Sequence, residues 1–153
     1  MKLELSINTS DIKKRIATYQ GDIDASIDKA VFRAANAGIA LMLNRTERGQ
    51  GINSAFAPYS TRYANLKKQG WAGGNGRSAF SGDPSGEVNL TVTGRMLSSL
   101  IAVKRRGYAE IKFSNGESAK KAYFNNRRRP FFGFNSQERK QLTSIMRREI
   151  FKK

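Results

Sequence analysis

The side chains that most often carry out chemistry in proteins are scarce in this sequence. Its 153 residues include neither histidine nor cysteine, which removes the commonest general base, the commonest metal ligand and any thiolate nucleophile. Three acidic residues, Asp22, Asp24 and Asp28, can share one face of a helix. The simplest interpretation is that they stabilise the positive N-terminal end of a helix that begins there. We therefore predict a non-enzymatic protein with no cofactor and no metal site.

The glycine-rich segment from Trp71 to Arg77, WAGGNGR, is a second place where chemistry is conceivable. Phosphate-binding loops use glycines in this way, but they follow a strand in a fixed register. No strand pattern precedes this segment in that register, so we do not predict a nucleotide site.

Basic residues are the most prominent potential contacts. The formal net charge is +16, and residues 104–153 contain 15 Lys or Arg against 4 Asp or Glu. A field of this sign attracts polyanions. Composition alone does not separate DNA from an acidic protein as the partner. The candidate contacts for either one are Arg105, Arg106, Arg127, Arg128 and Arg129.

The last three of these arginines precede an aromatic segment, Pro130–Phe134. Basic and aromatic residues combine in this way on some nucleic-acid-binding surfaces. These aromatic residues stand where the chain enters a helix, however, and we expect them to anchor the core.

The elements that position these residues follow from periodicity. Residues 88–92, VNLTV, alternate apolar and polar side chains, which predicts a half-buried strand. From Thr93 the spacing becomes helical, and Thr93 is the predicted cap. Residues 101–103 and 108–113 predict the two strands of a hairpin, with Gly107 in its turn.

Two helices complete the predicted core. The first runs from about Asp22 to Arg45, after an interruption at Gly21, and carries many small residues. We expect it to pack flat on the sheet, and a contact with another subunit is the alternative. The second runs over residues 136–151 from a capping box of Asn135 and Glu138. The predicted class is α+β, with a small, mainly antiparallel sheet packed by a long helix, a C-terminal helix and a long, partly irregular loop.

That loop covers residues 48–87 and shows no periodicity apart from a short helix expected at residues 61–68. Aromatic residues in such a segment normally bury against something. We predict an arm that folds against a neighbouring subunit, and contact with DNA is the alternative. The candidate subunit-interface residues are Phe56, Tyr59, Tyr63, Trp71 and Phe80.

Length and hydropathy set the outer limits of the prediction. The chain fits one domain, residues 1–153, with a short strand at residues 1–8. No apolar run approaches the roughly 20 residues of a membrane span, and the N-terminus lacks the apolar block of a signal peptide. We predict no membrane partner.

Four motifs in chain order resemble the phage virion morphogenesis (tail completion) family and, more distantly, the neck and tail-terminator proteins of tailed phages. They cover most of the chain from about Ala34 onwards, whereas the insert at residues 73–87 matches no family motif. The motifs are LNRT at 43–46, FAPYS at 56–60 with Tyr63 and Lys67 behind it, LTVTGRMLSSL at 90–100, and RPFFGF at 129–134.

The resemblance implies a structural virion protein without enzyme activity. Such a subunit forms a ring around the DNA channel at the neck or tail end, as a head–tail connector or tail terminator, and is assembled in the host cytoplasm. We expect six subunits rather than twelve, with neighbouring connector or portal-side proteins and tail tube or sheath proteins as partners, and non-specific contact with passing DNA. A general, sequence-independent nucleic-acid-binding protein is the alternative, because the same charge suits it.

Overall fold

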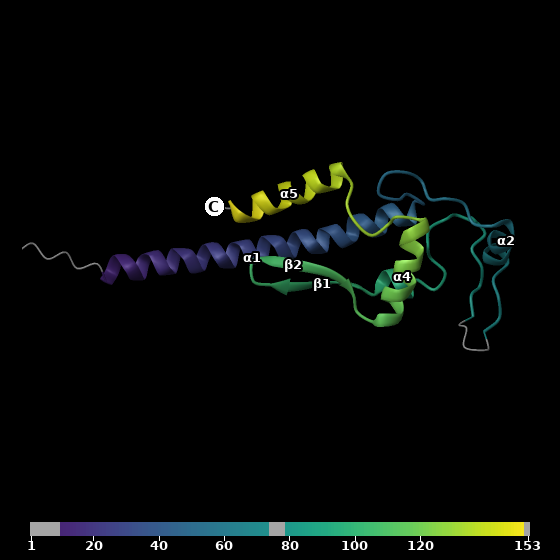
Figure 1. The fold of residues 1–153 in the computed structure, drawn as a ribbon, viewed down its shortest axis with the longest axis horizontal. Coiled ribbons are helices and arrows are strands. Elements are labelled where there is room, and N and C mark those ends of the chain that lie inside the picture. Colours follow the sequence, from purple (N-terminus) through teal and green to yellow (C-terminus); the bar gives the residue numbers. More distant parts are fainter. Residues whose placement is uncertain (1–9, 74–78, 152–153) are drawn as a thin grey trace, which may run out of the picture.

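A single long helix, α1 (Ser10–Glu47), forms the axis of the molecule (Figure 1). The computed structural model describes residues 10–73 and 79–151, and the strand predicted at residues 1–8 lies outside them. Gly21 lies within α1, although we predicted that the helix would begin after it. An exposed glycine costs a helix about 1 kcal/mol relative to alanine, so a helix of 38 residues continues through it.

The sheet is one antiparallel hairpin of β1 (Leu100–Arg105) and β2 (Tyr108–Phe113). Its ends are fixed by the pairs Leu100 with Phe113 and Arg105 with Tyr108. Gly107 stands in the turn with a φ of 78°, a left-handed conformation that glycine adopts without strain. The hairpin and its turn residue were predicted, and the α+β class is confirmed.

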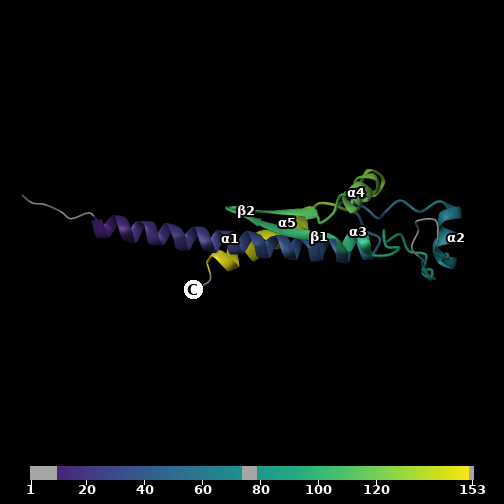
Figure 2. The same cartoon turned by 90° about the horizontal axis from the view of Figure 1, so that it is seen from below.

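α1 packs along both the hairpin and the C-terminal helix α5 (Ser136–Ile150). Figure 1 shows α5 on one side of α1 and the hairpin on another, and Figure 2 shows the hairpin closely following α1. Small residues, among them Ala30, Ala34 and Gly38, form the middle of the buried face of α1, and Met42, Arg45 and Thr46 are buried near its end. A Cβ atom built on Gly38 would lie 2.6 Å from Cζ of Phe134. The small side chains therefore allow the close, flat packing that the sequence predicted.

A second layer gathers where α1 ends. It comprises α2 (Thr61–Gln69), the single-turn α3 (Arg95–Ser98) and α4 (Gly116–Arg128). Figure 1 places α4 beside the end of α1 and α2 farthest out. The short helix expected at residues 61–68 corresponds to α2. The buried cluster that joins this layer contains Phe56, Leu97, Ala122 and Phe131.

The strand predicted at residues 88–92 is wrong, because this segment is irregular in the structure. Its backbone groups bond to side chains in place of a neighbouring strand. The amide oxygen of Asn89 accepts hydrogen bonds from the backbone of Thr91 and from Nζ of Lys67, at 3.1 and 2.8 Å. Leu90 has a φ of 55°, which interrupts any extended run. Residues 88–92 are all half-buried in this irregular segment, so the alternation of apolar and polar side chains does not mark a strand.

The helix predicted from Thr93 is also shorter and starts later. Gly94, at a φ of 71°, is its N-cap, and no side chain caps this end. The helix ends at Ser98, and the apolar residues Leu100 and Ile101, which continued the helical spacing, begin β1.

The C-terminal helix begins as predicted. Asn135 accepts a hydrogen bond from the backbone of Glu138 at 2.8 Å, and the Glu138 carboxylate accepts one from the backbone of Asn135 at 2.9 Å. This is the reciprocal capping box. Within the described ranges, no helix combines the length and the apolar character that a membrane span needs.

Candidate functional site

Residues from two predicted sets meet at one groove: Arg128 and Arg129 from the arginines before Pro130, and Tyr59, Tyr63 and Trp71 from the aromatic residues of the 48–87 segment. This groove has a volume of about 1070 Å³ and lies between α2 with its preceding loop and the pair α3 and α4. We refer to it as the basic–aromatic groove. Its lining includes Tyr59, Tyr63, Trp71, Leu90, Val92, Arg95, Met96, Glu117, Lys121, Arg128 and Arg129.

Tyr59 is the best-fixed aromatic residue of the groove. Its ring centroid lies 5.5 Å from Nζ of Lys67 and 4.6 Å from Cζ of Arg129, and both cations lie over the ring. Tyr63 packs against it edge to face at 4.8 Å. The backbone N–H of Leu90 donates a hydrogen bond to the Tyr59 hydroxyl at 3.2 Å. Burial raises the pKa of both tyrosines, so their hydroxyls stay protonated at neutral pH.

Lys67 connects α2, which follows Tyr59 in the chain, to the segment of residues 83–89. Its side chain is completely buried, and Nζ lies 2.9 Å from Oδ2 of Asp83. The same ammonium donates hydrogen bonds to the backbone oxygen of Glu87 at 2.6 Å and to Oδ1 of Asn89 at 2.8 Å. Hydrogen bonds from Ser85 and from this ammonium lower the pKa of Asp83 to about 2. Lys67 therefore ties residues 83–89 to α2.

Arg129, at the end of α4, holds the loop that precedes α2. From the C-cap of α4 it donates to the backbone oxygens of Ala57 and Pro58, at 2.8 and 2.9 Å. We predicted a contact with DNA or an acidic partner for Arg129. Its donors instead hold the loop that carries Tyr59 in place.

The remaining cations give the groove its charge. Arg95, Lys121 and Arg128 line it and are exposed, with Glu117 as the one acidic residue among the lining residues. Arg127, the neighbouring candidate, is exposed on α4 and is not a lining residue. The sequence indicated Arg128 through the arginine run, but Arg95 and Lys121 reach the groove only through the fold.

The other predicted interface residues have partners within the chain. Phe56 is 8% exposed and lies in the core cluster, in place of the neighbouring subunit that we expected. Trp71 and Phe80 pair as an isolated backbone bridge, and their ring centroids are 4.9 Å apart. This bridge closes the segment on itself next to the groove.

Arg105 and Arg106 lie at the hairpin tip, away from the basic–aromatic groove. Arg106 faces Asp24 of α1 at 3.6 Å, and Arg105 faces Glu110 at 3.9 Å. Asp28 accepts a hydrogen bond from the backbone of Gly107 at 2.7 Å. The interpretation of the α1 acids as residues of a helix start is wrong, because they lie in the middle of α1. Asp24 and Asp28 attach the basic hairpin tip.

Arg45 is a buried anchor whose role the sequence did not indicate. It forms an ion pair with Glu138, and both side chains are 8% exposed. Its Nη2 donates to the backbone oxygens of Phe131 at 2.6 Å and Gly133 at 3.0 Å. Arg45 therefore joins the end of α1 to the aromatic segment and to the start of α5. No local pattern pairs residues 93 positions apart.

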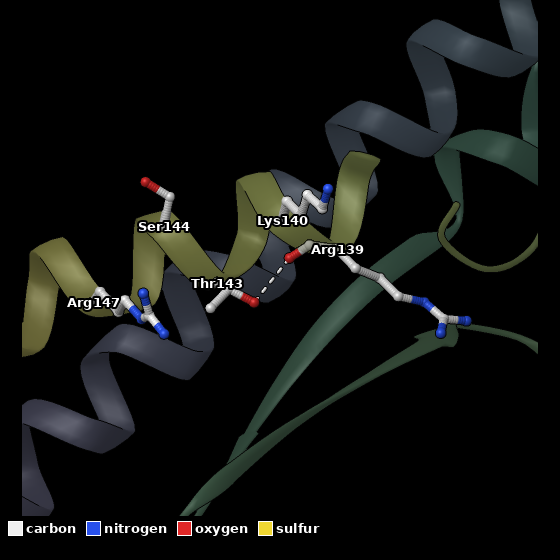
Figure 3. Close-up of a pocket in the computed structure, with 5 residues that line it drawn as sticks. All are labelled: Arg139, Lys140, Thr143, Ser144 and Arg147. Atoms are coloured by element: carbon white, nitrogen blue, oxygen red, sulfur yellow. Dashed lines mark hydrogen bonds between the residues drawn. The ribbon is translucent and has the colours of Figure 1, made fainter. Parts of the chain in front are cut away.

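A second basic surface lies on the outer side of α5. It is a shallow hollow of about 410 Å³ lined by Arg139, Lys140, Thr143, Ser144 and Arg147 (Figure 3). The Thr143 hydroxyl donates a hydrogen bond to the backbone oxygen of Arg139 at 2.9 Å. The lining comes from one helix only, so this hollow offers charge with little shape.

The basic–aromatic groove and the hollow on α5 offer charge and shape with which a ligand or partner can be bound. In the part of the chain that the structure describes, no three metal-ligating side chains gather. No family model matches the chain, and neither a curated protein nor a solved structure matches it. The resemblance to the tail completion family therefore stays a prediction that rests on the four motifs.

Proposed function

We propose that this chain is a non-enzymatic structural subunit of a tailed-phage virion, which assembles into a homomeric ring at the neck or tail end. The ring surrounds the DNA channel as a tail completion, connector or terminator component. One observation carries the proposal: the N-terminal part of α1 presents an apolar stripe that the described residues of the chain leave uncovered.

The stripe lies on the N-terminal part of α1, which projects beyond the hairpin and α5 (Figures 1 and 2). Ile16, Tyr19 and Ile23 are 54%, 70% and 55% exposed. At helical spacing they continue the face that buries Ala30 and Ala34 farther along the helix. A helical segment of this length without packing is only marginally stable in water. A second copy of the chain is the occupant that we propose.

The accessible surface supports assembly as well. The chain exposes 11474 Å², whereas a compact protein of its mass exposes about 7,800 Å². Contacts with neighbouring subunits can bury part of this excess, since one half of a standard interface covers about 800 Å².

The family motifs support a structural role in another way. Arg45, Tyr59, Lys67 and Phe131 each belong to one of the four motifs, and each is a packing anchor. A motif that fixes a scaffold fits a protein whose function is to present surfaces. The net charge of +16 suits a channel through which DNA passes without being read, because phosphate contacts carry no base information.

The test is the mass of the full chain in solution, alone and with connector or tail components, by native mass spectrometry and light scattering. We expect a hexamer for the wild type. The variant Ile16→Ser/Tyr19→Ser/Ile23→Ser should form smaller species, with unchanged hairpin and core by circular dichroism and denaturation.

The matched control is Lys14→Ser/Thr18→Ser/Ala25→Ser, which changes the opposite face of the same exposed segment and should leave the mass unchanged. A wild-type chain that stays monomeric at assembly concentrations, with and without those components, contradicts the proposal. Equal loss of assembly in both variants contradicts the role of the stripe.

The second candidate, a general nucleic-acid-binding protein, is favoured by the hollow on α5, where Arg139, Lys140 and Arg147 gather. Its test is DNA binding by the free subunit at physiological salt. A ring component should bind weakly, without base preference, and with an affinity that falls steeply as salt rises. Tight binding by the monomer, or a strong preference for a sequence or structure, favours the second candidate.

A further inference from the structure

The basic–aromatic groove has the features of a binding site that the scaffold does not use for itself. Its volume, about 1070 Å³, is that of a large ligand cleft. Arg95, Lys121 and Arg128 line it from two elements, α3 and α4, and all three are exposed. Glu117 balances only one of these charges. The groove therefore complements an anionic ligand.

The aromatic residues argue against a nucleic acid strand as that ligand. Proteins that bind single strands stack successive bases on open aromatic faces. Here two cations already lie over the Tyr59 ring, at 4.6 and 5.5 Å. Tyr63 packs against Tyr59 edge to face, and Trp71 packs against Phe80. The packed ring faces hold the wall of the groove and are not open for bases to stack on.

The rest of the lining suits a peptide. Leu90, Val92 and Met96 contribute apolar surface beside the cations. Met96 is a flexible side chain that adapts to irregular apolar partners. An extended peptide places alternate side chains on opposite faces, so a sequence of alternating acidic and apolar residues can meet the cations and the apolar surface together.

We propose that the basic–aromatic groove binds an acidic, extended segment of a neighbouring virion protein, with its carboxylates on Arg95, Lys121 and Arg128 and its apolar side chains on Leu90, Val92 and Met96. The identity of the partner as a virion protein rests on the proposed function. The groove chemistry does not depend on the ring, so binding is measurable on the full chain in any oligomeric state.

The experiment uses two labelled probes with equal negative charge and fluorescence anisotropy at physiological salt. One is a short peptide of alternating glutamate and leucine, and the other is an oligothymidylate. We expect the peptide to bind more tightly. The variant Arg95→Ser/Lys121→Ser/Arg128→Ser should weaken peptide binding about tenfold, because each of the three exposed charge pairs contributes about a factor of two to the affinity.

The control Lys140→Ser/Arg147→Ser/Arg148→Ser removes the same charge from α5, where all three residues are exposed, and should change peptide affinity less than twofold. A third variant, Val92→Glu, leaves the cations in place but puts a carboxylate among the apolar side chains, and should weaken the peptide as well. Circular dichroism verifies the fold of each variant.

Three outcomes overturn the proposal. Oligothymidylate binding that is as tight as peptide binding, and that the groove variant abolishes, makes the groove a nucleic acid site. Equal weakening by groove and control variants reduces the effect to overall charge. Absence of peptide binding removes the site altogether. Failure of ring formation in the mass measurement affects none of these readouts, so the two proposals fail separately.

Discussion

The ion pair between Arg45 and Glu138 provides the sharpest test of how α1 is joined to α5. Replacing Arg45 with Met keeps an unbranched apolar stem and removes the charged guanidinium group. The Glu138 carboxylate then loses its counterion while both side chains are only 8% exposed. The backbone oxygens of Phe131 and Gly133 lose their donors at the same time.

Breaking a buried ion pair from one side costs about 3–5 kcal/mol, a large part of the 5–15 kcal/mol that stabilises a typical domain. For a chain of this length it corresponds to a fall in Tm of roughly 6–20 °C. Urea denaturation followed by circular dichroism measures the free energy of unfolding directly. Adding Glu138→Gln to the variant should recover part of the loss, because the unpaired buried charge disappears.

The matched control is Arg33→Met. Arg33 also pairs with a glutamate, Glu149, but its side chain is 55% exposed and Lys29 pairs with the same carboxylate. An exposed pair contributes about 0–1 kcal/mol. If Arg45→Met costs no more than Arg33→Met, the pair at the end of α1 does not anchor the fold, and our account of this junction is wrong.

Four further predictions concern other parts of the chain. Gly38→Ala should cost about 1–3 kcal/mol of unfolding free energy, because the added Cβ meets Phe134 at 2.6 Å. Gly21→Ala, with nothing within 4 Å, should gain up to about 1 kcal/mol. The pKa of Asp83 is lowered from 3.8 to about 2, so its stabilisation is complete above pH 3.8 and is lost as the pH falls towards 2. In acid titrations followed by circular dichroism, Asp83→Asn should remove that part of the pH dependence, and an unchanged titration contradicts the assignment. Limited proteolysis should cut residues 48–87 more slowly in the assembled ring than in the free chain, and equal cutting rates argue against the predicted arm.

The features that the sequence predicted correctly are those that neighbouring residues determine. Gly107 specifies the hairpin turn because few other residues adopt its φ of 78° without strain. Asn135 and Glu138 specify the start of α5 because they satisfy each other's backbone donors three residues apart. The α+β class follows from these elements, since both the hairpin and the C-terminal helix can be recognised from residues that are close in the sequence.

The features that the sequence did not predict depend on contacts between distant residues. Lys67 draws the backbone of Glu87 and the side chain of Asn89 to α2, which replaces the expected strand at residues 88–92. Asp28 of α1 accepts a hydrogen bond from Gly107 at the hairpin tip, 79 residues away. The sequence predicted some residues of the candidate site but not their arrangement. Arg128 and the tyrosines were named from composition and spacing, whereas their meeting in one groove required the fold.

Only a few residues of the segment that follows α2 contact the elements around the basic–aromatic groove. The chain leaves α2 through Trp71 and returns through Phe80, and these two residues exchange backbone hydrogen bonds of 2.8 and 3.0 Å. Asp83 then bonds back to α2 through both its backbone and its carboxylate. Doubling the length of a closed loop costs only about 0.6 kcal/mol, so the segment between Trp71 and Phe80 can change in length or sequence at little cost to the fold. Lys67 and Arg129, which hold the groove walls through the contacts described above, both lie outside this segment.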